Sequence, residues 1–125
     1  MAVSPAAQRI APLWLPPLVL MAVIFLLSAQ PDLNSGLGTI DLIGRKIIHA
    51  SEYALLCFLW WRALRTLVAD LPAVAGAFAI AVAYSSTDEW HQTFVSGRHG
   101  SPVDVLIDAT GAAVAALLIV RRSRT

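Results

Sequence analysis

The sequence has few charged residues and a single cysteine. Charged side chains make up 14% of its 125 residues, whereas a soluble globular domain has about 25%. Cys57 has no second cysteine with which to form an internal disulfide, which excludes a disulfide-stapled secreted module. Nine basic and eight acidic residues give a formal net charge of +1, without the basic excess of a nucleic-acid-binding protein. Nucleic acid is therefore not an expected partner.

Hydrophobic residues are abundant and gather in long runs. They make up 58% of the sequence, against about 45–50% in soluble domains. Four runs, at residues 10–29, 46–67, 72–89 and 103–120, are each close to the roughly 20 residues with which a helix crosses a bilayer. The sequence therefore predicts an all-α fold, in which residues 1–125 form a single domain and an integral membrane bundle of four transmembrane helices.

The first run has some features of a secretory signal peptide, because Arg9 precedes an apolar stretch. That stretch exceeds the usual h-region of about 7–15 residues, and Ser28-Ala29 is a poor cleavage site. We therefore expect a retained transmembrane helix.

Basic residues flank the four runs unevenly. One side has Arg9, Arg62, Arg65, Arg121, Arg122 and Arg124, and the other has Arg45, Lys46 and Arg98. Because Lys and Arg are enriched in cytoplasmic loops, both termini are predicted to be cytoplasmic in a multi-pass membrane protein. Trp14, Trp60 and Trp61 are then expected to anchor the inner membrane interface, and Trp90 the outer one.

This topology places three polar helix ends at the outer membrane surface. They are the start of the second run, the end of the third and the start of the fourth. Their polar residues are Lys46, His49, Glu52, Tyr53, Asp88, Glu89, Gln92, Asp104 and Asp108, with Arg98 on the outer loop. A charged side chain that faces lipid costs roughly 2.5–3.5 kcal/mol, so we expect these residues to face one another.

Helical spacing supports shared polar faces within these segments. Lys46, His49 and Tyr53 are spaced i, i+3 and i+7, and Asp104 and Asp108 are spaced i and i+4. One interpretation is a structural ion-pair network that holds three helices together. The other is a functional site, because the carboxylates outnumber the nearby cations. Carboxylates suit Mg²⁺ or Ca²⁺, but no metal-binding motif is present, and no metal or cofactor is assigned.

Small residues recur at a spacing that lets membrane helices approach closely. Ala75, Ala79 and Ala83 follow one another every four residues in the third run, and Gly111 and Ala115 do so in the fourth. We expect these two stripes to form helix contacts.

The polar segments resemble those of the VanZ-like family. The resemblance rests on Ser28-Ala29-Gln30-Pro31, Lys46-x-x-His49-x-x-x-Tyr53, Asp88-Glu89-x-x-Gln92-x-Phe94, Arg98, Asp104, Asp108 and Gly111. It implies a small protein of the bacterial cytoplasmic membrane, from a family named for a role in resistance to the glycopeptide teicoplanin. The family's polar pattern falls on the residues that the predicted topology brings together.

Two functions are compatible with this pattern. In the first, an outward-facing site binds or modifies an anionic cell-envelope amphiphile, such as a membrane lipid or a lipid-linked envelope precursor. The expected catalytic residues are Asp88, Glu89 and His49, and the expected substrate-binding residues are Lys46, Tyr53, Gln92, Arg98, Asp104 and Asp108. In the second, the chain is a non-enzymatic binding, transport or accessory protein, including one assembled as a homo-oligomer, and the same cluster is a recognition or structural network.

Overall fold

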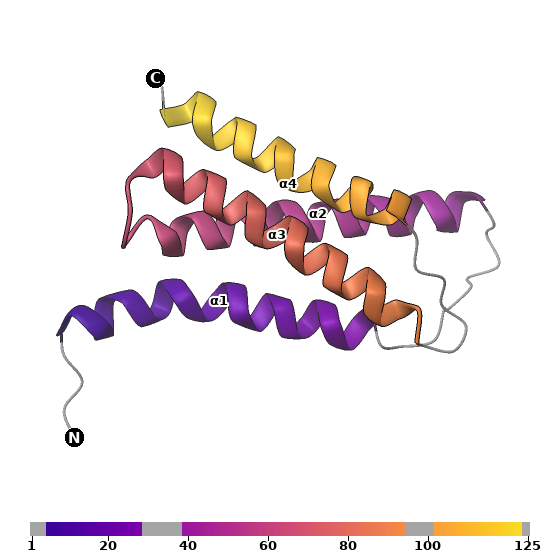
Figure 1. Ribbon diagram of the computed structural model, residues 1–125, viewed down its shortest axis with the longest axis horizontal. Helices are drawn as coiled ribbons and strands as arrows, with labels where there is room; N and C mark the ends of the chain where they lie inside the picture. The colour runs from indigo at the N-terminus through magenta and orange to yellow at the C-terminus, as the bar shows by residue number, and fades with distance from the viewer. Residues whose placement is uncertain (1–4, 29–38, 95–101, 124–125) are drawn as a thin grey trace.

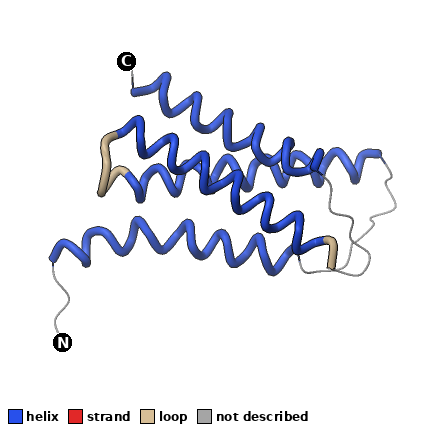
Figure 2. The backbone as a smooth tube through the Cα atoms, in the orientation of Figure 1, coloured by secondary structure: helices blue, strands red, loops and turns tan. Residues whose placement is uncertain are grey.

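The fold is a bundle of four helices. The computed structural model describes residues 5–28, 39–94 and 102–123, and among these residues there is no strand. The helices are α1 (Pro5–Ser28), α2 (Thr39–Leu64), α3 (Asp70–Gln92) and α4 (Pro102–Ser123) (Figures 1 and 2). Over these described ranges, the predicted all-α class and the predicted four helices are confirmed.

Each helix lies where a hydrophobic run predicted one, but their ends differ from the prediction. α2 begins at Thr39 instead of about Lys46, and α3 continues past Glu89 to Gln92. Hydropathy locates the apolar part of a helix and not its polar first or last turns. At 1.5 Å per residue the 26 residues of α2 are about 39 Å long, which exceeds a hydrocarbon core of about 30 Å.

Successive helices run in opposite directions along the bundle (Figure 1). α2, α3 and α4 pack against one another, and α1 lies mainly against α2. The start of α2, the end of α3 and the start of α4 therefore meet at one end of the bundle, whereas the start of α1 and the end of α4 lie at the other end. The polar segments that are far apart in sequence are close together in space.

Small residues and one tyrosine form much of the bundle core. Tyr53, Leu56 and Cys57 of α2 are fully buried, and so are Ala77 and Ala81 of α3. Such small side chains let two helix backbones come close together.

The predicted contact stripe on α3 is in the wrong register. Ala75, Ala79 and Ala83 are exposed, and the buried stripe of α3 is Ala73, Ala77, Ala81 and Ser85. Both stripes repeat every four residues, so spacing alone does not distinguish the face that packs on α2 and α4 from the face that points outward.

The expected close approach at Gly111 is present between α4 and α2. A Cβ atom added at Gly111 would lie 2.0 Å from the Ala50 carbonyl oxygen. This is far inside van der Waals contact, so only glycine fits at this crossing.

One of the four tryptophans does not lie where the sequence placed it. Trp60 is 8% exposed and belongs to the core, where its ring meets that of Trp14 edge to face at a centroid distance of 5.6 Å. Its predicted role as an interfacial anchor is therefore wrong. Trp90 is 67% exposed.

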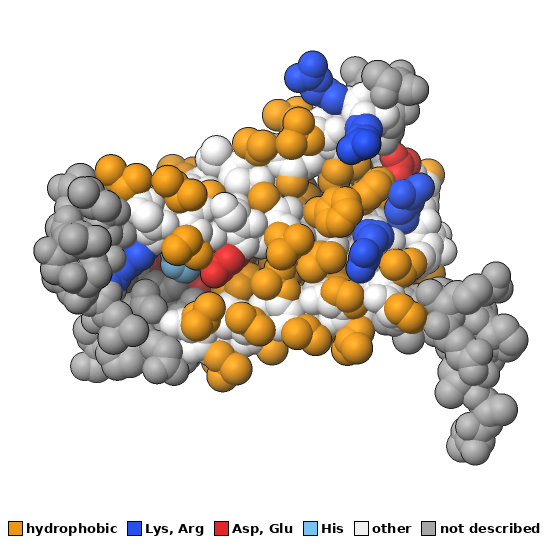
Figure 3. All heavy atoms as spheres, turned by 180° about the vertical axis from the view of Figure 1, so that it is seen from behind, with side chains coloured by type: hydrophobic (Ala, Val, Ile, Leu, Met, Phe, Trp, Pro, Cys, Tyr) orange, Lys and Arg blue, Asp and Glu red, His pale blue; other side chains and the backbone are white. Residues whose placement is uncertain are grey.

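The outer surface of the bundle is strongly apolar. Large hydrophobic side chains are exposed on every helix, for example Leu18, Ile47, Leu71 and Leu117. In Figure 3 such side chains cover the middle of the molecule, and charged side chains lie nearer its two ends. By length and composition, one helix of the described residues, Pro102–Arg122, is suited to cross a membrane, and Pro12–Leu27 is a shorter apolar helix. A crossing by all four helices stays a prediction.

Candidate functional site

The outermost contact of the polar end joins α2 to α4. The Lys46 Nζ atom donates a hydrogen bond to Asp104 Oδ1 at 2.9 Å. The two side chains are 37% and 32% exposed, so the pair contributes little net stability, about 0–1 kcal/mol. The bond uses one of the three N–H donors of the ammonium group, so Lys46 can still bind another anion.

A buried layer lies deeper between the helices. It consists of Tyr53, Ser85, Asp88 and Asp108, each of which is at most 3% exposed. The Ser85 Oγ atom donates a hydrogen bond to Asp108 Oδ2 at 2.8 Å and thereby links α3 to α4. Asp108 is one turn further along α4 than Asp104, about 6 Å deeper into the bundle.

Some oxygen atoms of this buried layer have no hydrogen-bond partner within the described part of the chain. Among them are the Tyr53 hydroxyl and the second carboxylate oxygen of Asp108, Oδ1. Tyr53 lies close enough to Asp108 and Asp88 for electrostatic interaction with both. A buried polar group without a partner costs about 1–3 kcal/mol, and in native proteins such groups usually meet a water molecule or a ligand.

The Lys46–Asp104 pair forms the rim of this polar end. Three further side chains, those of His49, Glu52 and Glu89, lie between the rim and the buried layer. The His49 Nδ1 atom is 3.7 Å from Glu52 Oε2, and both side chains are partly exposed. Glu89 is 8% exposed, and Asp108 is within electrostatic range of it. Groups with acid-base capacity therefore lie at intermediate depth, between partly exposed cations and the buried layer.

The first helix also contributes to this end of the bundle. The Tyr84 hydroxyl donates a hydrogen bond to the Met21 carbonyl oxygen, and the Phe25 ring stacks on His91 at a centroid distance of 4.5 Å. No sequence signal pointed to Phe25, because it lies in an apolar run whose members look alike.

Most of the predicted site residues lie at this end of the bundle. They are Lys46, His49, Tyr53, Asp88, Glu89, Asp104 and Asp108. Gln92 is the last residue of α3, and its side chain lies outside the described residues, as does the whole of Arg98. Ser85 is a further member, bonded to Asp108, and its spacing of three and four residues to Asp88 and Glu89 places the three side chains on one face of α3.

The carboxylates are spread over different depths instead of converging on one point. Within the described ranges, no group of three His, Cys, Asp or Glu side chains is arranged to hold a metal ion. The arrangement is better suited to hydrogen bonding than to metal coordination, because acceptors and hydroxyl groups lie in the interior and a cation lies at the rim.

The chain was also compared with known proteins. The family described as VanZ/LLP1 matches residues 9–122, a range that includes every residue of the candidate site. No curated protein and no solved structure matches the chain.

Proposed function

The chain belongs to the VanZ/LLP1 family, and we propose that it is a multi-pass membrane protein that binds the head group of an anionic envelope amphiphile between α2, α3 and α4. At the family level, membership suggests a membrane protein associated with teicoplanin resistance. The amphiphile, a membrane lipid or a lipid-linked envelope precursor, is our extension of that family-level statement.

The observation that carries the proposal is the pair of unsatisfied oxygens in the buried layer. The Tyr53 hydroxyl and Asp108 Oδ1 are enclosed by three helices and bond to no described residue. A head group that carries hydroxyls would donate to the carboxylate oxygen and accept from the tyrosine. Such bonds would offset the cost of burying both groups.

The charge of the proposed ligand follows from the partly exposed basic groups outside the buried layer. Lys46 and His49 are partly exposed, and Lys46 keeps two N–H donors beyond its bond to Asp104. An anionic phosphate or carboxylate would bind there, while the apolar tail would lie against the hydrophobic outer surface of the helices. An enzymatic form of the proposal assigns Asp88 or Glu89 as the general base, with His49 as the alternative.

A non-enzymatic scaffold is the second candidate, and two bonds favour it. Lys46 to Asp104 joins α2 to α4, and Ser85 to Asp108 joins α3 to α4. Bonds of this kind between helices are what a structural network requires. In that case the cluster would recognise a partner or only hold the bundle together.

Native mass spectrometry of the purified protein separates the two candidates. Tyr53→Phe removes only the hydroxyl, and we expect it to lower the retained fraction of an envelope amphiphile about fivefold, which corresponds to ~1 kcal/mol. Tyr84→Phe is the matched control, because its hydroxyl is bonded to Met21 and not to the buried layer. Equal retention by the wild type and Tyr53→Phe would favour the scaffold.

A further inference from the structure

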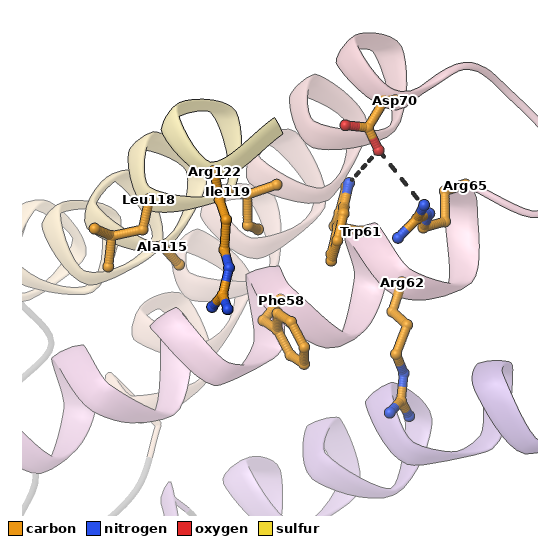
Figure 4. A pocket seen from close by; sticks show the side chains of 9 residues that line it. All are labelled: Phe58, Trp61, Arg62, Arg65, Asp70, Ala115, Leu118, Ile119 and Arg122. Atoms are coloured by element: carbon orange, nitrogen blue, oxygen red, sulfur yellow. Dashed lines mark hydrogen bonds and ion pairs between the residues drawn. The ribbon is translucent and has the colours of Figure 1, made fainter. Parts of the chain in front are cut away.

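A pocket lies at the opposite end of the bundle, between the last turns of α2 and α4. Its volume is about 620 Å³. Phe58, Leu118 and Ile119 line its apolar wall, and side chains from both helices surround it (Figure 4). The proposed function does not use this pocket. The pocket shares no residue with the polar cluster at the other end of the bundle, which consists of Lys46, His49, Glu52, Tyr53, Ser85, Asp88, Glu89, Asp104 and Asp108.

The charged residues of the pocket are mostly arginines. Arg62, Arg65 and Arg122 line it together with a single carboxylate, Asp70. Asp70 Oδ1 accepts a hydrogen bond from Trp61 Nε1 at 3.0 Å and lies 3.9 Å from Arg65 Nε. Three guanidinium groups and one carboxylate line the pocket, so the lining as a whole has an excess of positive charge.

Two features distinguish this pocket from a simple basic surface. The Arg62 Nε atom is buried and has no hydrogen-bond partner within the described ranges, so it is a donor shielded from solvent. The Arg65 guanidinium lies 4.7 Å from the centroid of the Trp61 ring, while Asp70 accepts from the same indole. These contacts hold the pocket wall in place before any ligand binds, which reduces the entropic cost of binding.

We infer that this pocket binds an anionic membrane phospholipid. The arginines would hold the phosphate of the head group, because a guanidinium donates a planar pair of bonds to phosphate oxygens. The acyl chain would lie along Phe58 and Leu118, whose side chains are exposed on the apolar outer surface of the bundle. Basic pockets between membrane helices are a known way to bind anionic head groups. In the predicted orientation the lipid comes from the cytoplasmic leaflet.

The topological role of basic residues does not explain the pocket. The positive-inside rule requires only that arginines lie near the membrane, and exposed arginines satisfy it. Arg121 and Arg122 are both exposed at the end of α4, but only Arg122 lines the pocket. The Arg122 side chain extends from α4 towards α2 (Figure 4). These adjacent residues therefore form a matched pair for an experiment.

The experiment is native mass spectrometry of the detergent-purified protein titrated with phosphatidylglycerol or with phosphatidylcholine of the same acyl chains. We expect phosphatidylglycerol to be retained at least about tenfold more strongly, since each ionic hydrogen bond contributes roughly 1.5–3 kcal/mol. Arg122→Gln and Arg62→Gln should each reduce this preference about threefold or more, whereas Arg121→Gln should keep it. Arg122 lies in the exposed last turn of α4, so we expect the Arg122→Gln protein to fold normally.

Three results would overturn the inference. Equal retention of both lipids would show that charge is not recognised. An equal loss in Arg121→Gln and Arg122→Gln would show a general surface-charge effect. Displacement of phosphatidylglycerol by an equal concentration of glycerol phosphate would show an anion site without lipid recognition, because the apolar wall would then contribute nothing.

Discussion

The Gly111 Cα and the Ala50 carbonyl mark a close crossing of α4 and α2, where an added Cβ would lie 2.0 Å from the carbonyl oxygen. This crossing adjoins the polar side chains of both helices, because Gly111 follows Asp108 by one turn on α4 and Ala50 directly follows His49 on α2. The spacing of α2 and α4 at Gly111 therefore determines how the polar side chains on both helices meet.

Gly111→Ala should destabilise the bundle strongly. The methyl group would collide with backbone atoms, which cannot rotate away, so we expect a loss of about 1–3 kcal/mol or more, measured as a lower thermal unfolding temperature in detergent. Gly44→Ala is the control, since no atom lies within 4 Å of a Cβ added there. Gly44→Ala should be neutral or slightly stabilising. A Gly111→Ala protein with wild-type stability would contradict the close crossing.

The register of the α3 contact face gives a second prediction. Ala77 is fully buried and Ala79 is exposed, although they are only two residues apart. Ala77→Leu should overpack the core and cost about 1–3 kcal/mol, whereas Ala79→Leu should be tolerated. Thermal unfolding of the two variants in the same detergent compares them directly. A larger loss for Ala79→Leu would mean that the originally predicted stripe is the packed one.

Ala77 and Ala79 show what the sequence could and could not predict about the fold. The number and approximate positions of the helices follow from hydropathy, because long apolar runs separated by polar turns have few other solutions in a membrane protein. The rotation of a helix about its axis is set by its neighbours. Two alanine stripes of equal spacing occur on α3, and only the packing against α2 and α4 selects Ala77 over Ala79.

The candidate site was easier to predict at its charged positions than at its apolar ones. Lys46 and Asp108 stood out because charge is rare in this chain. Phe25 gave no such signal, and its stacking on His91 depends on how α1 packs. Trp60 was assigned to the interface from its type and its predicted depth, whereas packing against Trp14 places it in the core.

The bond between Ser85 and Asp108 gives a third prediction. Ser85→Ala would leave both Asp108 carboxylate oxygens without a described partner, so we expect a loss of about 1–3 kcal/mol. Ser86→Ala is the matched control, because Ser86 is exposed and its hydroxyl bonds only to the Val82 carbonyl within its own helix. Chemical denaturation or thermal unfolding would measure both. Equal stability of the two variants would show that the buried bond contributes nothing.

The orientation in the membrane gives a fourth prediction. Thr93 and Ala69 are exposed and lie near opposite ends of the bundle, and the native Cys57 is buried. With both termini cytoplasmic, Thr93→Cys should react with a membrane-impermeant maleimide on intact cells, and Ala69→Cys only after permeabilisation. Wild-type protein reports the background from Cys57. The reverse pattern would place the polar cluster on the cytoplasmic side.

The last prediction concerns the two adjacent carboxylates at the end of α3. Asp88→Asn and Glu89→Gln keep the shape of the side chains and remove their charge. Asp88 and Glu89 are at most 8% exposed, and each carboxamide keeps most of the hydrogen-bonding capacity of the carboxylate, so we expect a loss of no more than about 1–2 kcal/mol if the two residues are only structural. A general base or a carboxylate that orients a bound head group needs its charge. We therefore expect both variants to insert and unfold like the wild type, while at least one fails to restore an envelope phenotype, such as glycopeptide susceptibility, in a strain that lacks the protein.

Arg121→Gln is the control for this complementation, since it changes charge at the opposite end of the bundle, outside both the polar cluster and the arginine-lined pocket. It should complement fully. Expression and membrane insertion of each variant are checked by immunoblot of the membrane fraction, so that a loss of phenotype is not a loss of protein. Full complementation by both Asp88→Asn and Glu89→Gln would remove these carboxylates from any charge-dependent mechanism. The bonds that join α4 to α2 and α3 would then be the main role of the cluster, because they do not depend on either residue.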